Sequence, residues 1–178
     1  MRKLICTLIF GAALLASPAH ASNCPSEGVV QSATSAFMVA ARRGSPQGFS
    51  SAAARYADLR RLALFALGPY RRDLPADMEG HYISLARTFM GKFMADHAEG
   101  LTGGTLAITA CSTSNGNTVV AGRLSSGNSV VFRLSGNDRI EDVTVSGISI
   151  AQALRSKFTG VIRDNGGDIN ALISYLEQ

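Results

Sequence analysis

The segment EDVTVSGISIAQALRSKFTGVIRDNGGDINALISYLEQ (Glu141–Gln178) decides the fold, because it changes from the period of a strand to the period of a helix. Its DVTV run alternates polar and apolar side chains, which is typical of a β-strand. After Gly147 the apolar residues recur at helical spacing, at Ile150, Leu154, Phe158 and Val161. We predict a helix over about 150–164 and a second one over 168–176, with Asp168 as its N-cap.

Four short β-rich runs lead into this pair of helices. They read TLAITACS, NTVVAGRLS, SVVFRLS and RIEDVTV, and they are separated by TSNGN, SGN and GND. Asn-Gly and Gly-Asn pairs between alternating runs are typical of tight hairpin turns. The runs therefore predict four consecutive antiparallel strands.

Three helices are predicted before the strands. The first carries a stripe of apolar residues that stops at Arg42-Arg43-Gly44, and the second starts at Ser50 or Ser51 as N-cap and ends near Gly68. The third begins near Pro75 and has a broad apolar face made by Met78, Tyr82, Leu85, Phe89 and Phe93. We predict an α+β fold in which several helices wrap a curved, four-stranded antiparallel sheet. Such a shape either packs solidly or encloses a pocket.

The first 21 residues have the form of a signal peptide. Arg2 and Lys3 precede an apolar core from Leu4 to Leu15, and small residues precede Ser22. We expect cleavage after Ala21, which leaves residues 22–178 as a single exported domain. No other stretch has the length of about 20 apolar residues that a membrane-spanning helix needs.

The charge of the chain argues against nucleic acid as a partner. Loss of the signal peptide lowers the formal net charge from +4 to +2, because 15 basic and 13 acidic residues remain. The chain also has no dense basic run with interleaved aromatic residues. Cys24 and Cys111 then remain as a pair, and in an exported protein they form either a disulfide or two buried thiols.

No arrangement of reactive side chains predicts catalysis. His81 and His97 lie sixteen residues apart on one predicted helix, so they cannot share a metal ion. Glu141 and Asp142 are adjacent on a strand and point to opposite faces. Nucleophile-elbow, zinc-binding and phosphate-loop motifs are missing from the sequence. We therefore predict no enzymatic activity, no catalytic residue, no metal and no cofactor.

Three basic doublets remain to be explained: Arg42-Arg43, Arg60-Arg61 and Arg71-Arg72. They are either solvated helix ends or a means of steering an anionic headgroup or an acidic partner surface.

Two blocks of the sequence resemble the MlaC family, also called the toluene-tolerance family, of periplasmic phospholipid-binding proteins. The first block, LALFALGPYRRDLPADMEGHYISLARTFMGKF (62–93), has its matching positions at Leu67, Gly68, Tyr70, Arg71, Phe89 and Phe93. The second, RIEDVTVSGISIAQALRSKFTGVIRDNGGDINALISYL (139–176), matches at Ile140, Asp142, Val143, Val145, Gly147, Ile148, Ser149, Arg155, Ser156, Phe158, Gly166, Gly167, Asp168, Ile169, Leu172, Ile173 and Leu176. The resemblance implies an NTF2-like, MlaC-like fold.

The resemblance also implies a function. Members of the family carry phospholipid across the periplasm, between an inner-membrane ABC transporter complex with its substrate-binding subunit and an outer-membrane lipoprotein–porin complex. Such a role maintains the lipid asymmetry of the outer membrane and needs no cofactor beyond the bound phospholipid.

A carrier of hydrocarbon needs an apolar cavity, because each exposed methylene costs about 0.8 kcal/mol. We predict that the cavity is lined by Tyr82, Leu85, Phe89, Phe93, Val131, Val143, Val145, Ile148 and Phe158, with Tyr70 and Arg71 at its mouth. Each of these apolar residues can equally be ordinary core. Two alternatives remain: a carrier of another amphiphile, such as a hopanoid, and a small enzyme with a cone-shaped pocket.

Overall fold

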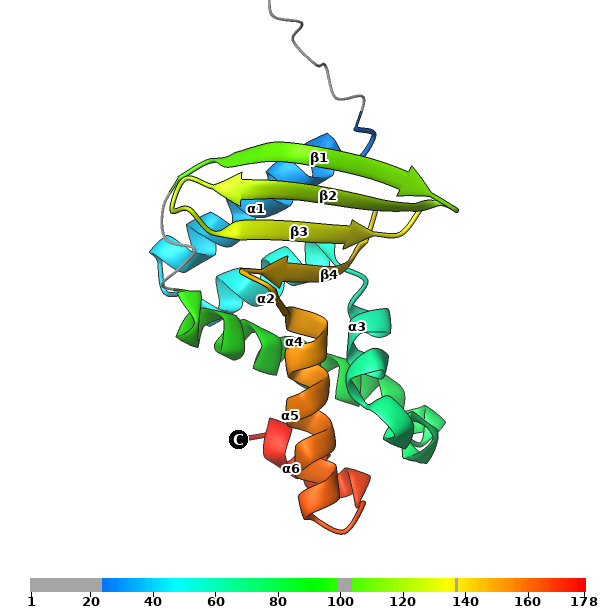
Figure 1. Cartoon of the computed structure of the whole chain (residues 1–178). Coiled ribbons are helices and arrows are strands. Elements are labelled where there is room, and N and C mark those ends of the chain that lie inside the picture. The colour runs from blue at the N-terminus through cyan, green and yellow to red at the C-terminus, as the bar shows by residue number, and fades with distance from the viewer. Residues whose placement is uncertain (1–23, 99–103, 137) are drawn as a thin grey trace, which may run out of the picture.

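The computed structural model describes residues 24–98, 104–136 and 138–178 (Figure 1). The predicted signal peptide lies outside these described residues. The elements follow in the order α1 (Glu27–Arg42), α2 (Pro46–Tyr56), α3 (Leu59–Ala66), η1 (Gly68–Asp73), η2 (Ala76–Met78), α4 (Glu79–Asp96), β1 (Leu106–Ser114), β2 (Asn117–Leu124), β3 (Ser129–Leu134), β4 (Ile140–Val145), β5 (Ile148–Ser149), α5 (Ile150–Asp164) and α6 (Ile169–Leu176).

The sheet is an antiparallel meander with the order β1-β2-β3-β4-β5. It has five strands rather than the predicted four, because the chain turns back after β4 and pairs Ile148 and Ser149 with the end of that strand. Ser146 and Gly147 make this turn with positive φ values of 49° and 85°, as the central residues of a type I′ hairpin do. Bulges in β1 and at the β3–β4 pair help to curve the sheet.

The segment before α4 differs from the sequence prediction. Helix α2 begins at Pro46, with the Ser45 hydroxyl accepting a hydrogen bond from the Gly48 amide at 3.0 Å. Ser50 and Ser51 therefore lie inside the helix and do not cap it. The predicted single helix is interrupted after Tyr56, where the chain is extended and forms a bridge to Ile140 of β4. The break lets the Asp58 amide donate to the Ile140 carbonyl at 2.8 Å, so the chain leaves the helix in order to pair with β4.

The two C-terminal helices match the sequence prediction closely. Ser149 caps α5 by accepting from the Gln152 amide, and Asp168 caps α6 by accepting from the Asn170 amide. Helix α5 extends away from the sheet beside α3, and α6 folds back against α4 (Figure 1). No helix in the described ranges combines the length and the apolarity that a membrane crossing requires.

A disulfide and an arginine are among the long-range connections that fix α1 and α2 to the sheet. Cys24, just before α1, forms a disulfide with Cys111 of β1, and their Cα atoms are 5.7 Å apart. The Arg139 guanidinium donates hydrogen bonds to three carbonyl oxygens at the end of α2, those of Ala54, Arg55 and Ala57, at 3.1, 2.6 and 2.6 Å. Carbonyls in the last turn of a helix have no partner within the helix, so Arg139 acts as the C-terminal cap of α2.

Candidate functional site

A cavity of about 80 Å³ lies between the sheet and the helices α1, α2 and α4. Strands β2, β3 and β4 form one wall with Leu124, Val130, Phe132, Ile140, Asp142, Val143 and Val145. The helices form the other wall with Thr34, Phe37, Met38, Phe49, Ala53, Met90 and Met94, and Ala57, Leu62 and Ile150 complete the lining. All but two of these side chains are apolar, so the cavity offers a hydrocarbon environment.

The sheet wall follows from the period of two along paired strands. Val130 pairs with Val145, and Phe132 pairs with Val143, so all four point to the same face of the sheet. Val130 and Phe132 are buried, with 3% and 4% of their surface exposed. The helices α1, α2 and α4 cover this face, because they border the same cavity from the opposite side.

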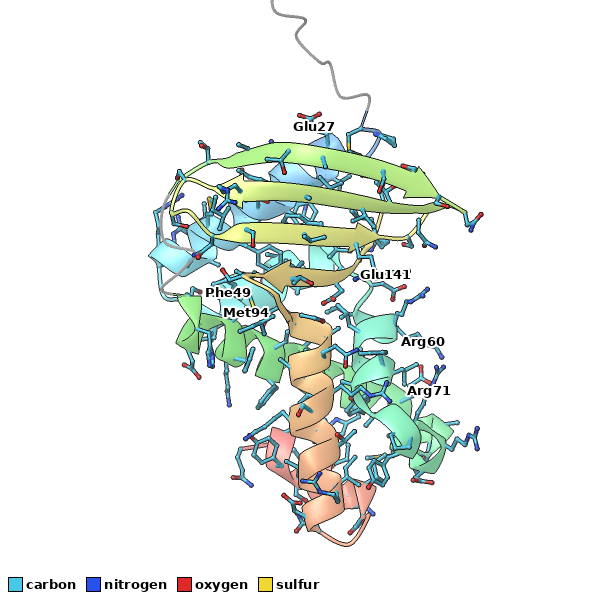
Figure 2. All side chains as sticks on the ribbon, in the orientation of Figure 1. Glu27, Phe49, Arg60, Arg71, Met94 and Glu141 are labelled. Carbon is cyan, nitrogen blue, oxygen red and sulfur yellow. A yellow bond between two sulfur atoms is a disulfide. The ribbon has the colours of Figure 1, made fainter. Side chains whose placement is uncertain are left out.

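The helical wall lies where the hydrophobic core divides. The larger core cluster contains Met38, Ala53 and Met90, whereas a smaller cluster is built around Phe49, with Phe37 and Met94 packed against it. The cavity is lined by both clusters. Phe37 and Phe49 stack with ring centroids 6.2 Å apart, and Figure 2 shows Phe49 and Met94 close to each other at one side of the molecule.

The two polar residues of the lining differ in how their oxygens are satisfied. Asp142 accepts hydrogen bonds from the Ser149 hydroxyl at 2.7 Å and from the Ala151 amide at 3.0 Å, so its carboxylate serves the first turn of α5. The Thr34 hydroxyl is buried and has no hydrogen-bond partner among the described residues. The lining therefore offers no carboxylate that is free for acid–base chemistry.

Outside the cavity, several charged and polar groups are held in structural contacts. Arg60 pairs with Glu79 and Arg61 with Glu141, at 2.6 and 2.9 Å. Burial raises the pKa of the Tyr82 phenol far above its usual range, and the phenol donates a 2.7 Å hydrogen bond to the Ala63 carbonyl. Within the described ranges no three His, Cys, Asp or Glu side chains are close enough to hold a metal ion.

A family model for the MlaC protein matches residues 40–178, which is most of the chain. The chain belongs to the MlaC family. The match begins within α1 and includes every strand, both C-terminal helices and most of the cavity lining.

Comparison with solved structures supports the same fold. The phospholipid-binding protein from Ralstonia solanacearum, solved in complex with a phospholipid, superposes with a TM-score of 0.70 and 16% sequence identity. The alignment covers 85% of this chain and 94% of that one. No curated protein sequence matches the chain significantly. At this identity the likeness shows the fold alone, and the fold is the predicted α+β arrangement.

The C-terminal MlaC-like signature has a structural explanation. Asp142 and Ser149 hydrogen-bond to each other and to the first turn of α5, and Gly147 takes the positive φ that the β4–β5 turn requires. These three residues fix the angle at which α5 leaves the sheet. They therefore hold the architecture of the cavity, although only Asp142 lines it.

The predicted strand residues of the pocket lie in different places. Val143 and Val145 line the cavity. Val131 lies on the other face of β3, because its neighbours Val130 and Phe132 are the inward pair. Ile148 is 65% exposed in the short strand β5 and lines no cavity wall.

The predicted aromatic face of α4 packs away from the cavity. Tyr82, Leu85, Phe89 and Phe93, together with Phe158 of α5, are not part of the lining. The Phe89 ring lies 5.3 Å from that of Phe158 and 6.4 Å from that of Phe93, and Tyr82 and Phe158 are fully buried. The Phe89 ring of α4 contacts Phe158 of α5 and Tyr175 of α6, whereas Met90 and Met94 of the same helix border the cavity.

The predicted mouth residues lie far from the cavity lining. Tyr70 and Arg71 belong to η1, which follows α3 and contacts α5. In Figure 2, Arg71 projects from the side of the molecule opposite to Phe49 and Met94. Neither residue borders the cavity, so the structure gives them no role at its opening.

Sequence reasoning missed the contribution of α1 and α2. Phe37, Met38, Phe49 and Ala53 line the cavity, but their helices are rich in alanine and serine and carry few large apolar residues. Phe49 was the one sequence signal that α2 contributes to the cavity wall, because it is a large aromatic residue among mostly small ones.

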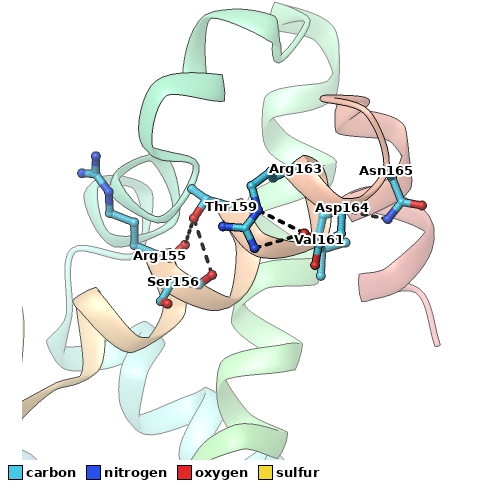
Figure 3. A network of polar contacts seen from close by, with 7 residues as sticks. All are labelled: Arg155, Ser156, Thr159, Val161, Arg163, Asp164 and Asn165. Atoms are coloured by element: carbon cyan, nitrogen blue, oxygen red, sulfur yellow. Dashed lines mark hydrogen bonds and ion pairs between the residues drawn. The ribbon is translucent and has the colours of Figure 1, made fainter.

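Helix α5 carries a group of polar side chains that hydrogen-bond or form ion pairs within the same helix. Thr159 donates to the Arg155 carbonyl at 2.7 Å, and Arg163 pairs with the adjacent Asp164 at 3.0 Å (Figure 3). All of these contacts join residues of one helix, so this network is not a candidate site.

Proposed function

We propose that this MlaC-family chain is a periplasmic carrier of phospholipid, and that the cavity between the sheet and α1, α2 and α4 holds acyl chain. The observation that carries the proposal is the lining: every side chain of the cavity wall except Thr34 and Asp142 is apolar. The Ralstonia protein of the same fold, which is described as phospholipid-binding, supports the choice of ligand.

The energetics of a lipid carrier fit such a lining. Exposing a typical acyl chain to water costs on the order of 10 kcal/mol, at about 0.8 kcal/mol for each methylene. A carrier offsets this cost with apolar contacts and needs no reacting group. Asp142 is the one ionisable side chain of the lining, and its oxygens are already used in capping α5.

The cavity must widen to hold an acyl chain. Its volume of about 80 Å³ is smaller than the roughly 150 Å³ that accommodates a benzene molecule in an engineered cavity. Three of the lining residues are methionines, Met38, Met90 and Met94, and the unbranched methionine side chain adapts to irregular spaces at low cost. We infer that rotation of these side chains and of Phe37 and Phe49 makes room for the ligand.

We further propose that the carrier exchanges lipid with an inner-membrane ABC transporter complex, through its substrate-binding subunit, and with an outer-membrane lipoprotein–porin complex. Membership of the MlaC family supports this role. A carrier of this kind needs no catalytic residue, no metal and no cofactor other than its lipid ligand, and we propose that this chain uses none.

Organic extraction of the purified chain, lacking residues 1–21, followed by mass spectrometry tests the ligand. Phospholipid in about stoichiometric amount is the expected result. A polycyclic lipid in its place would make the chain a carrier of hopanoid-like amphiphiles. A chain that carries and accepts no amphiphile, and that turns over a small substrate, would refute the proposal in favour of an enzyme.

A pair of valine substitutions tests the position of the ligand. Val145→Asp places a carboxylate in the apolar lining, and we expect loss of lipid retention because an unpaired charge is poorly tolerated there. Val131→Asp is the matched control, since Val131 lies on a neighbouring strand but on the outer face of the sheet. Circular dichroism shows whether each variant is folded. Equal lipid retention in the two folded variants would place the ligand elsewhere.

A further inference from the structure

Four basic side chains gather on the outer side of the helices that wall the cavity. Arg43 follows α1, Arg55 lies on α2, and Arg87 and Lys92 lie on α4. Arg55, Arg87 and Lys92 border a groove between α2 and α4, and Arg43 and Arg55 border a second groove between α1 and α2. Because Arg55 belongs to both grooves, the four residues form one continuous surface, the α1–α2–α4 basic face.

This surface carries charge of a single sign. The sequence has no acidic residue from Gly28 to Ala57 and none from Gly80 to Ala95. Within the described residues no carboxylate forms an ion pair with any of the four basic side chains of the face. Arg60 and Arg61, by contrast, are paired with Glu79 and Glu141. A local positive potential therefore exists on a chain whose net charge without the signal peptide is only +2.

The composition of the face favours a bilayer over a protein partner. Besides its cations, the groove between α2 and α4 is lined by small and polar residues: Pro46, Gln47, Ser50, Ser51, Ala54 and Thr88. Protein interfaces are anchored by large buried aromatic and aliphatic side chains. The groove between α2 and α4 offers none, and the groove between α1 and α2 adds only Val39 and Tyr56 as large apolar side chains. Attraction between scattered cations and an anionic bilayer surface needs no such anchors.

We propose that the α1–α2–α4 basic face binds anionic lipid bilayers, with its arginine and lysine side chains against the lipid phosphates. The same helices present Phe49, Ala53 and Met90 to the cavity on their inner side. Docking through this face therefore brings the helical wall of the cavity against the membrane. The proposal goes beyond the cargo of the cavity and does not depend on it.

Vesicle sedimentation of the purified chain, lacking residues 1–21, tests the proposal. At low salt we expect binding to vesicles of phosphatidylcholine mixed with phosphatidylglycerol, and little binding to vesicles of phosphatidylcholine alone. A cation near an anionic surface increases partitioning about fivefold, so the double variant Arg87→Gln/Lys92→Gln should bind about 30-fold more weakly. Binding should also weaken at physiological salt, where charges are screened within about 8 Å.

The matched control is Arg71→Gln/Arg72→Gln, which removes the same charge from η1, away from the face. This control should bind within about twofold of the unmodified chain. Equal losses in the two double variants would mean that net charge alone drives binding and would overturn the proposal. Failure of the unmodified chain to bind anionic vesicles at low salt would also overturn it and leave an acidic protein surface as the partner of the face.

Discussion

Enlarging Ala53 distinguishes a hollow interior from a solid one by the sign of its effect on stability. Ala53 lies on α2, is 4% exposed and borders the cavity. An empty space of about 80 Å³ costs about 24 cal/mol for each Å³, or about 2 kcal/mol in all. Burying the three additional carbon atoms of Ala53→Leu stabilises the fold by a similar free energy, at about 0.8 kcal/mol for each carbon.

Ordering the new side chain offsets part of this gain. Immobilising a leucine costs about 0.5–1 kcal/mol, so the delipidated Ala53→Leu variant should be more stable by about 1 kcal/mol. For a chain of this length that corresponds to a rise in Tm of about 2–4 °C. The same variant should retain less lipid than the unmodified chain, because the leucine occupies part of the space that the acyl chain needs.

The control for Ala53→Leu is Ala86→Leu, on α4. Ala86 is also a buried helical alanine, 2% exposed, but it does not border the cavity. Overpacking a filled region costs about 1–3 kcal/mol, so this variant should lose stability. Thermal melts of both delipidated variants provide the comparison. If Ala53→Leu is destabilised as much as Ala86→Leu, the space beside α2 is not available to additional carbon, and the assignment of the cavity fails.

Three further substitutions test the scaffold. Arg139→Ala removes three hydrogen bonds from a charged donor and should lower the free energy of unfolding by about 2–3 kcal/mol in urea titrations; an unchanged midpoint would show that α2 needs no such cap. The double variant Cys24→Ser/Cys111→Ser opens a link across 87 residues and should lose about 4 kcal/mol, as should the unmodified chain under reducing conditions. Above pH 10 the unfolded chain releases the Tyr82 proton while the folded chain retains it, so stability falls by up to about 1.4 kcal/mol for each pH unit. Tyr82→Phe should remove that part of the slope, and identical slopes would contradict the raised pKa.

The sequence predicted the strands and the C-terminal helices well because their signals are local. Asn115 and Gly116 adopt positive φ at the β1–β2 turn, as an Asn-Gly pair between alternating runs predicts. Ser149 and Asp168 cap their helices through their own side chains. Turn and cap chemistry depends on residues a few positions apart, so it can be read from the chain directly.

The lining of the cavity was harder to predict because it depends on contacts between distant segments. Val130, Val131 and Phe132 are all apolar, so alternation alone does not show which of them faces the helices. The break at Ala57 depends on a bridge to Ile140, which lies more than eighty positions later in the chain. The aromatic stripe of α4 predicted a buried face correctly, but the choice of α5 and α6 as its partners is a property of the whole fold.

The cap at Arg139 has a consequence for the direction in which a ligand enters. Its three hydrogen bonds, together with the bridge between Ala57 and Ile140, set a fixed gap between α2 and the sheet at one end of the cavity. In Figure 2, Met94 lies well to the left of Glu141, the neighbour of Ile140, and we expect the Met94 and Phe37 side chains to rotate when a ligand enters. The slender methyl end of an acyl chain suits the fixed gap beside Arg139. The bulkier glycerol backbone suits the side where Met94 can rotate. We therefore expect the ligand to enter in one orientation, with the methyl end of its acyl chain toward Arg139.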